Sequence, residues 1–215
     1  MQPEYIGSNK YILWPMPIIE IKWRDKIFLS AKDGFGWNMV KTRHLNFGPL
    51  VHYYLGSQDY PSGMDSVDAG GQFGAFVNFA FGHWRLDAKA LYAFSGSSEG
   101  ARANVGLSYG TRINKVWKIV MRAGVSYFND NEMKTYFGVS QREASSDASS
   151  GMRQYSAKKG FADVGFGAEI AYGFTKNWSG IIKLKATQLL GDAADSPLTT
   201  KDFQGYGGVG FAYTF

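Results

Sequence analysis

Residues 205–215, GYGGVGFAYTF, decide the fold of this chain. Phe211, Tyr213 and Phe215 recur at every second position, so their three rings lie on one face of an extended strand. The residues between them are small or polar and form the opposite face. A soluble domain rarely ends on such a series of rings, whereas a strand with lipid on one side and a polar lumen on the other is expected to show it. The carboxyl terminus therefore predicts a membrane β-barrel.

The same two-residue alternation recurs along most of the chain. In residues 84–95, for example, Trp84 and Leu86 share one face, while Arg85 and Lys89 share the other. No stretch has a convincing helical period, so we predict an all-β, antiparallel transmembrane barrel that occupies residues 1–215 as one domain. Counted back from the carboxyl terminus, the predicted strands lie at 204–215, 178–190, 161–174, 116–128, 101–113, 84–95, 69–81, 45–55, 34–41, 26–32 and 11–23.

The connections between these strands alternate in length. Short turns are expected near 82–84, 114–115 and 175–177, and longer polar loops near 56–68, 95–100, 129–160 and 191–203. Outer-membrane barrels have short periplasmic turns and long extracellular loops, and they carry aromatic girdles at both interfaces. A tryptophan follows each of the three short turns, at Trp84, Trp117 and Trp178. A soluble sandwich also alternates, but its outer faces are polar, so we favour the membrane barrel.

The strand count is informative because single-chain bacterial barrels normally have an even number of strands. Eleven is odd, so we interpret one strand as missing, most simply at the N-terminus, with Met1 as an internal start. Two strand edges would then be unpaired, and we expect imperfect closure. The alternative is that 26–41 forms one bent strand, which gives a total of ten.

Composition excludes several classes of protein. The chain has no cysteine, which rules out disulfides and thiolate metal sites, and no apolar run approaches the length of roughly 18 residues that a membrane helix needs. No leader sequence is present, so an exported protein would be a processed or truncated form. The net charge of +5 is scattered along strands rather than clustered, which argues against nucleic acid. No catalytic, phosphate-binding or metal motif occurs, so we expect neither enzyme activity nor a cofactor.

Three segments go beyond the general barrel pattern: PEYIGSNKYILWPMP (3–17), TYFGVS (135–140) and LLGDAADSPLTT (189–200). Together with Tyr155, Gly160, Asp163 and the terminal aromatic strand, they resemble the MipA/OmpV family of MltA-interacting outer-membrane proteins. The resemblance implies a bacterial outer-membrane barrel of about twelve strands, preceded by a signal peptide and a first strand. It also implies a scaffold in murein synthesis, linked to a lytic transglycosylase and a penicillin-binding protein. Outer-membrane lipid, lipopolysaccharide and the barrel-assembly machinery are further expected partners, the last through the aromatic C-terminal signal.

A scaffold of this kind would meet its partners at the periplasmic turns. The candidate residues form a basic rim that suits an acidic partner or the carboxylates of peptidoglycan. They are Arg43, His83, Lys115 and Lys176, with Lys41 and His44 nearby.

The predicted lumen is the second candidate site. Its basic positions are Lys22, Arg24, Arg85, Lys89, Arg102, Arg112, Lys118, Arg122, Lys183 and Lys185, and its acidic positions are Glu20, Asp87, Asp163 and Glu169. Ten cations less four carboxylates leave about six positive charges. Two interpretations remain open: a structural network of ion pairs, or a path for anions. A barrel of intermediate width does not decide between them, so an anion channel is the first alternative to the scaffold.

Two loops complete the set of candidates. Loop 129–160 contains the serine-rich stretch QREASSDASSGMRQY and is predicted to be a mobile extracellular loop or, as a second alternative function, an adhesive surface. In the GDAADSP segment, Asp192 and Asp195 either form an Asx-type turn or bind a cation weakly, and we favour the turn.

Overall fold

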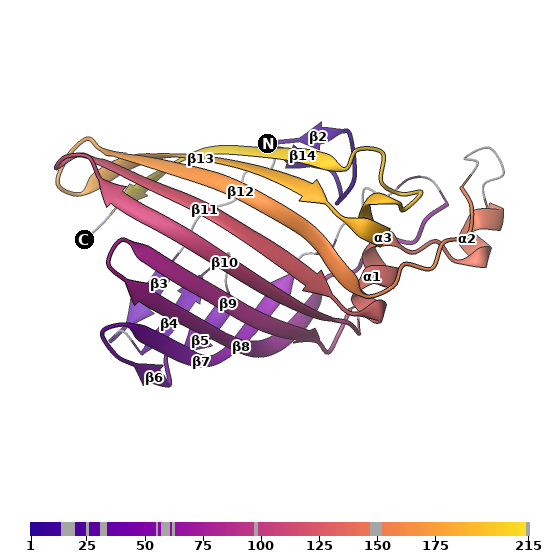
Figure 1. Ribbon diagram of the computed structural model, residues 1–215, viewed down its shortest axis with the longest axis horizontal. Helices are drawn as coiled ribbons and strands as arrows, with labels where there is room; N and C mark the ends of the chain where they lie inside the picture. The colour runs from indigo at the N-terminus through magenta and orange to yellow at the C-terminus, as the bar shows by residue number, and fades with distance from the viewer. Residues whose placement is uncertain are drawn as a thin grey trace.

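A computed structural model describes residues 1–13, 20–24, 26–30, 34–54, 56, 61, 63–96, 99–146 and 152–213. Within these ranges the chain is almost entirely antiparallel β-structure with three short helices (Figure 1). The strands are β1 (Gln2–Pro3), β2 (Tyr11–Ile12), β3 (Glu20–Trp23), β4 (Ile27–Ser30), β5 (Gly34–Trp37), β6 (Val40–Lys41), β7 (Leu45–Tyr54), β8 (Gly70–Phe81), β9 (Trp84–Ala93), β10 (Ala101–Arg112), β11 (Trp117–Phe128), β12 (Gly160–Gly173), β13 (Trp178–Leu189) and β14 (Phe203–Tyr213). The helices are α1 (Asp130–Phe137), α2 (Gln141–Ser146) and α3 (Gly191–Ala194).

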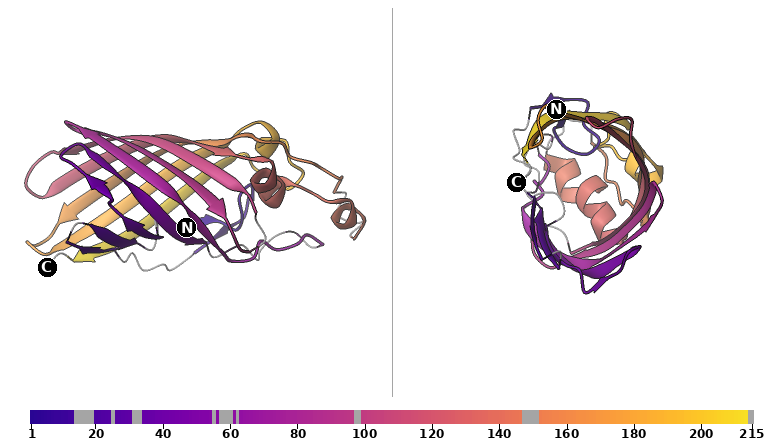
Figure 2. Two further views of the ribbon diagram at one scale, coloured as in Figure 1. Left: turned by 90° about the horizontal axis from the view of Figure 1, so that it is seen from below. Right: turned by 90° about the vertical axis from the view of Figure 1, so that its left-hand side faces the viewer.

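One large sheet contains every strand except β1 and β2. Its order is β3-β4-β5-β7-β8-β9-β10-β11-β12-β13-β14, and β6 pairs with β7 beside β5. All of these pairs are antiparallel, and the sheet curls into a barrel when seen end-on (Figure 2). The predicted all-β, antiparallel barrel is therefore confirmed.

The strands from β7 to β14 lie where the alternation predicted them, whereas the N-terminal strands differ. Strands β4 and β5 pair with each other, with Ile27 opposite Trp37 and Ser30 opposite Gly34. The alternative of one bent strand over 26–41 is therefore wrong. The predicted strand 11–23 is also partly wrong, because β2 pairs with β1 and only β3 joins the large sheet. Residues 14–19 lie outside the described residues.

The large sheet ends at β3 and β14, and no pairing joins these two strands in the part of the chain that the structure describes. The N-terminal segment lies against β14 instead (Figure 1). The Met1 ammonium donates to the Gly207 carbonyl at 2.7 Å, and the Gly207 N–H donates to the Met1 carbonyl at 3.1 Å. The Gly205 N–H donates to the Tyr11 hydroxyl at 3.0 Å. The N-terminal segment therefore contacts the β14 edge of the sheet, and the missing first strand and imperfect closure stay predictions.

The two faces of the sheet differ sharply, as the two-residue period requires. Large apolar side chains remain exposed on the outer face of β8 to β14: Phe73, Phe79, Trp84, Leu86, Tyr92, Val105, Leu107, Trp117, Met121, Phe166, Tyr172, Trp178, Ile182, Leu184, Val209 and Phe211. The inner face carries most of the polar and charged residues, together with a buried apolar cluster of Leu50, Phe76 and Leu91 packed against Phe28. Among the described residues, none of the helices is long and apolar enough to cross a membrane.

The two ends of the barrel also differ. One end, the short-turn end, carries the tight connections β8–β9, β10–β11 and β12–β13, and β14 runs toward it. The other end, the long-loop end, carries α1, α2 and α3 (Figure 1). The main cluster of buried apolar side chains lies at the long-loop end, around α1.

Candidate functional site

Helix α1 occupies the mouth of the barrel at the long-loop end, where it is visible through the ring of strands (Figure 2). Asn129 starts the helix, because its Oδ1 accepts the Glu132 N–H at 3.0 Å. The same oxygen accepts the Ala101 N–H at 2.9 Å and so fixes the helix to the start of β10. The prediction of a mobile polar loop over 129–160 is therefore wrong for its first part.

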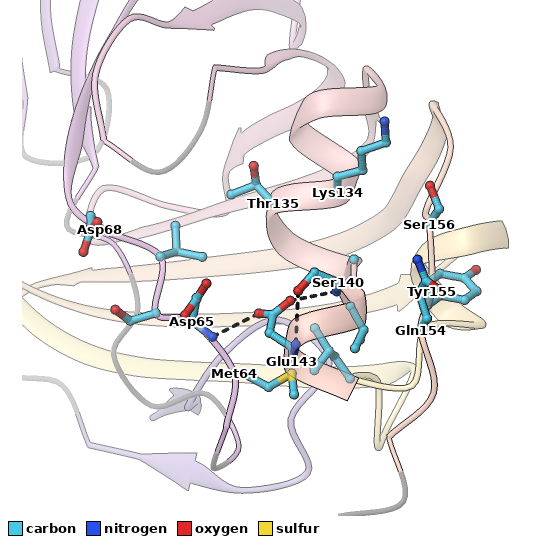
Figure 3. A pocket seen from close by; sticks show the side chains of 15 residues that line it. Met64, Asp65, Asp68, Lys134, Thr135, Ser140, Glu143, Gln154, Tyr155 and Ser156 are labelled. Atoms are coloured by element: carbon cyan, nitrogen blue, oxygen red, sulfur yellow. Dashed lines mark hydrogen bonds between the residues drawn. The ribbon is translucent and has the colours of Figure 1, made fainter. Parts of the chain in front are cut away.

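A cleft of about 560 Å³ lies beside α1, between residues 64–68, 138–143 and 154–156 (Figure 3). Glu143 joins its walls by accepting the Asp65 N–H at 3.0 Å and the Ser140 N–H at 2.7 Å. Ser140 accepts the Glu143 N–H in return at 3.2 Å, which makes a capping box at the start of α2. Burial opposes ionisation of Glu143, but these hydrogen bonds outweigh it and lower the pKa of the carboxyl group. An ion pair between Arg142 and Asp65 adds a second link.

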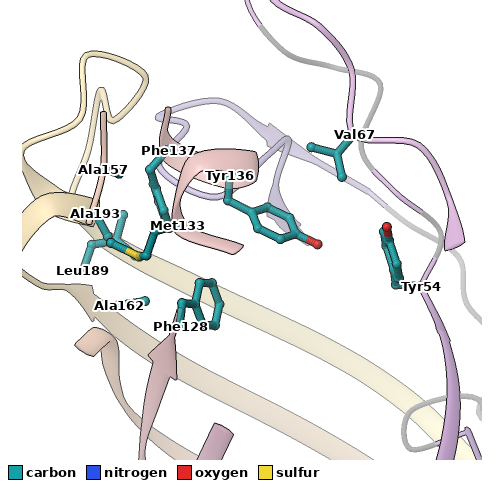
Figure 4. Packing of buried hydrophobic residues seen from close by; sticks show 10 residues of the cluster. All are labelled: Tyr54, Val67, Phe128, Met133, Tyr136, Phe137, Ala157, Ala162, Leu189 and Ala193. Carbon is teal, nitrogen blue, oxygen red and sulfur yellow. The ribbon is translucent and has the colours of Figure 1, made fainter. Parts of the chain in front are cut away.

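The inward side of α1 is packed against the ends of the strands (Figure 4). Met133 and Phe137 are 1% and 0% exposed, and they belong to one apolar cluster with Phe128, Leu189 and Ala193. Tyr54 and Val67 extend this cluster to the β7–β8 connection. The helix is therefore a packed plug rather than a loop resting on the surface.

An ion pair fixes the plug to the barrel wall. Arg102 Nε on β10 lies 2.7 Å from Glu132 Oε1 on α1, and the Glu132 side chain is fully buried. The guanidinium also lies 5.7 Å from the ring centres of Phe128 and Tyr136, and it donates to the Tyr136 hydroxyl at 3.3 Å. Burial raises the pKa of the Tyr136 phenol, although the charge of Arg102 partly offsets this effect.

The distinctive sequence segments meet around this plug. The Ser196 hydroxyl of segment 189–200 donates to the Phe137 carbonyl of segment 135–140 at 2.7 Å. The Tyr155 hydroxyl donates to the Asp192 carbonyl at 3.0 Å. The Thr200 N–H donates to the Gly7 carbonyl at 2.9 Å, which brings in the N-terminal segment. Segments distant in sequence therefore form one assembly at the long-loop end.

The acidic segment 191–195 is a helical turn rather than the expected Asx-type turn. Residues Gly191–Ala194 form α3, and the Asp195 N–H donates to the Gly191 carbonyl at 3.0 Å. Asp192 Oδ2 accepts the Lys158 N–H at 2.8 Å, so this carboxylate has a structural role. Within the described ranges, no group of three His, Asp or Glu side chains is placed to hold a metal ion.

The predicted lumen charges on β9 to β13 lie on the face of the sheet that contacts α1, because Arg102 on that face of β10 pairs with Glu132 of α1. The pairing of strands extends this face, with Ser108 opposite both Arg85 and Arg122. Glu169 lies 3.3 Å from Lys183 and 3.8 Å from Arg122, so three of the predicted residues form one ion-pair network.

The remaining inner charges are less closely connected. Arg85 pairs with Asp87 at 2.9 Å, and Lys185 Nζ lies 5.1 Å from the ring centre of Tyr206. Arg112 and Lys118 are opposite each other near the short-turn end, Lys89 is opposite Asn104, and Asp163 is opposite Ser126. The side chains of Arg85, Arg122 and Lys183 are 54%, 49% and 44% exposed, so water reaches this face.

Some predicted residues are placed differently or are not described. Arg24 was expected in the lumen, but it lies in the β3–β4 turn with its guanidinium 5.9 Å from the Trp23 ring centre. The side chains of Glu20, Lys22 and Tyr213, and all of Phe215, lie outside the described residues. Phe211 is 75% exposed on β14.

The predicted rim residues all lie at the short-turn end. Arg43 precedes β7, His83 lies in the β8–β9 turn, Lys115 in the β10–β11 turn and Lys176 in the β12–β13 turn, and all four are exposed. His83 Nδ1 donates to the Gly110 carbonyl at 3.1 Å, so its ring also fastens the turn to β10.

The sequence reasoning missed both helices of the long loop, although local signals were present. Asn129 and Glu132 form an N-x-x-E pattern, and Ser140 and Glu143 form an S-x-x-E pattern. Such spacing marks helix N-termini because the first side chain accepts a backbone N–H that the helix leaves unpaired.

Comparison with known proteins adds to this geometry. The family model described as "MltA-interacting protein MipA" matches residues 1–215. Curated proteins named MltA-interacting protein, from Escherichia coli (strain K12) and Shigella flexneri, are each 29% identical to the chain over 92 residues. This alignment covers 43% of the chain and spans 36% of the length of each relative. Because the family model matches the whole chain, the protein belongs to the MltA-interacting protein MipA family.

Proposed function

We propose that this protein is a non-enzymatic outer-membrane barrel and that its strands cross the lipid. The exposed apolar face supports this placement, because large side chains such as Phe166, Leu184 and Phe211 would otherwise remain in water. Burial of apolar surface is favourable by about 25 cal/mol per Å². Lipid provides that burial around the whole circumference of a barrel.

Aromatic pairs near the short turns support the same placement. The rings of Trp84 and Tyr109 are 4.9 Å apart, and those of Trp117 and Tyr172 are 4.7 Å apart. Aromatic girdles of this kind lie at the boundary between lipid and water. The short-turn end then faces the periplasm, as it does in bacterial outer-membrane barrels.

We further propose that the short-turn end is a scaffold surface for a peptidoglycan-remodelling enzyme, in the first place a lytic transglycosylase. The name of the curated relatives, MltA-interacting protein, supports a partner of this class. A penicillin-binding protein is the second partner that the family resemblance implies. The observation that carries the proposal is the exposed rim of Arg43, His83, Lys115 and Lys176, which come from four separate turns of one end. Such a surface favours a partner with complementary negative charge.

Charge reversal tests this proposal. The variant with Arg43→Glu, Lys115→Glu and Lys176→Glu should lose at least about tenfold in affinity for a purified transglycosylase of the MltA type, because each reversal replaces an attraction by a repulsion. Biolayer interferometry of the detergent-purified barrel would measure this loss.

The matched control carries the same change of charge at the opposite end. Arg153, Lys158 and Lys159 are exposed at the long-loop end, and their reversal to glutamate should leave the affinity within about twofold. Unchanged binding by the rim variant, or an equal loss in both variants, would show that the rim is not the contact surface.

Anion passage is the second candidate function, and one observation favours it. The inner face has more cations than carboxylates, and several of these cations remain about half exposed to water. Rings of Lys and Arg attract anions. Helix α1 stands in the way at the long-loop end, so passage would require its displacement.

A further inference from the structure

A second groove of about 560 Å³ lies at the short-turn end, on the N-terminal side of the barrel. It lies between the β3–β4 turn and the chain that leads from β5 through β6 to β7. Its lining residues are Arg24, Lys26, Asn38, Met39, Lys41, Thr42 and Arg43. Four of these seven are cations and none is acidic. Asp25 stands next to them in the sequence, so four positive charges less one leave a local charge of +3.

The first wall of the groove depends on an interruption of the sheet. Strands β5 and β6 both pair with β7, but the pairing stops between them, opposite Gly48 and Pro49. Pro49 has no N–H to donate to a neighbouring strand. A Cβ on Gly48 would lie 1.7 Å from the Trp37 carbonyl oxygen, so only glycine allows this close approach. The chain therefore leaves the sheet after Trp37 and places Met39 and Lys41 at the groove.

The second wall is the turn between β3 and β4. The Lys26 N–H donates to the Trp23 carbonyl at 3.0 Å, and the Asn38 N–H donates to the Lys26 carbonyl at 2.7 Å. Arg24 has φ +47° and is the one non-glycine residue with positive φ in the described ranges. This conformation is strained for an L-residue with a Cβ, and such strain concentrates at binding sites. Here the strained residue supplies one of the four cations.

Apolar side chains border the cations. Met39 is 51% exposed inside the groove, Trp23 is 64% exposed beside Arg24, and Trp37 and Val40 are also exposed. The groove therefore combines concentrated positive charge with an apolar margin that continues onto the outer face of the barrel. A ligand that matches both features has an anionic head and an apolar tail.

We propose that this groove binds the phosphate headgroup of an anionic phospholipid, with phosphatidylglycerol as the representative, from the leaflet on the short-turn side. The inference rests on the outer-membrane placement proposed above but not on the scaffold role. Arginine guanidinium groups bind phosphate through two parallel hydrogen bonds, and lysines add point charges. Met39 and Trp23 would contact the glycerol and the first acyl carbons. A free phosphate or a soluble acidic peptide lacks an acyl chain and would gain no contact with that apolar margin.

Native mass spectrometry of the detergent-purified barrel tests the site. Phosphatidylglycerol, zwitterionic phosphatidylethanolamine and inorganic phosphate are titrated separately, and the fraction of protein that retains one ligand is measured. We expect retention of phosphatidylglycerol at concentrations at which the other two are not retained. The double variant Lys26→Gln, Lys41→Gln should weaken this retention about thirtyfold, because each lysine near an anionic lipid surface contributes about 1 kcal/mol and two such losses correspond to that factor.

The matched control removes two lysines from other turns of the same end. Lys115→Gln with Lys176→Gln should change phosphatidylglycerol retention less than about twofold. The two experiments also fail independently, since Lys26 lines the groove but does not belong to the rim, and Lys26→Gln alone should still bind the transglycosylase. Loss of lipid binding alone leaves the scaffold proposal intact, and loss of transglycosylase binding alone leaves the lipid site intact.

Arg24→Gly separates binding from folding. Glycine adopts φ +47° without strain, so this variant should fold at least as well as the wild type while it lacks one groove cation. It should nevertheless retain less phosphatidylglycerol. Equal retention by the groove and control variants, equal retention of the two lipids, or retention of inorganic phosphate at the same concentration would each overturn the proposal.

Discussion

The ion pair between Arg102 and Glu132 holds helix α1 in the mouth of the barrel. Glu132 is fully buried, and Arg102 lies 2.7 Å from it. Removal of one partner from a buried ion pair leaves an uncompensated charge and costs about 3–5 kcal/mol. Arg102→Met should therefore lower the free energy of unfolding by about that amount, as measured by urea unfolding of the folded barrel in lipid vesicles.

Arg85→Met is the matched control, because its partner Asp87 is 41% exposed and lies outside the plug. Exposed pairs contribute about 0–1 kcal/mol. The double variant Arg102→Met, Glu132→Met should recover much of the stability, since it leaves no buried charge alone. Equal losses for Arg102→Met and Arg85→Met would mean that the ion pair does not stabilise the plug.

At the scale of the element, α1 depends on its N-terminal cap. Asn129 accepts two N–H groups, from Glu132 and Ala101, and loss of a cap of this type costs about 1–2 kcal/mol. In Asn129→Ala, amides of residues 130–137 should exchange with solvent about five- to thirtyfold faster, as measured by hydrogen–deuterium exchange. Asn131→Ala is the control, since its exposed side chain makes only a 3.4 Å bond to the Glu99 carbonyl. Equal acceleration in both variants would contradict the role of the cap.

The elements differ in how well the sequence predicted them. Strands β7 to β14 were predictable because each one extends over ten residues or more with a regular two-residue alternation, in which exposed apolar side chains form one face. Helix α1 was not, because its eight residues are too few for a clear helical period and tertiary packing stabilises it. Strand β2 was wrongly predicted to join the large sheet. It pairs with β1 over only two residues, and so short a strand shows no alternation in the sequence that would reveal its true partner.

The same reasoning explains what could be predicted of the candidate sites. Alternation placed Arg122, Glu169 and Lys183 on one face, and the structure brings all three together. It could not supply Glu132 as the partner of Arg102, because that contact joins a strand to a segment without periodicity. The groove at Arg24 was likewise hidden, since it arises from the break in the sheet opposite Pro49.

At the scale of the whole molecule, the two ends of the barrel differ, because α1 lies in the mouth at the long-loop end (Figure 2). The inner wall carries ion-paired charges such as Arg122, Glu169 and Lys183. This asymmetry separates the two candidate functions. A scaffold needs only the outer surface of the short-turn end, whereas a channel needs both ends open. The position of α1 therefore predicts that the intact protein conducts little in a planar lipid bilayer.

Replacement of residues 130–137 by a flexible Gly-Ser linker tests this prediction, because it removes the plug and leaves the strands in place. The opened barrel should pass anions in preference to cations, since Arg122, Lys183 and their neighbours outnumber the inner carboxylates. Lys183→Glu in the opened barrel should reduce that preference. The control replaces residues 141–146 by the same linker, because α2 lies beyond the mouth (Figure 1), and this variant should remain silent. Steady anion currents from the intact protein would contradict the plug and favour the channel, whereas a silent opened barrel would leave the inner charges a structural role and direct attention to the short-turn end.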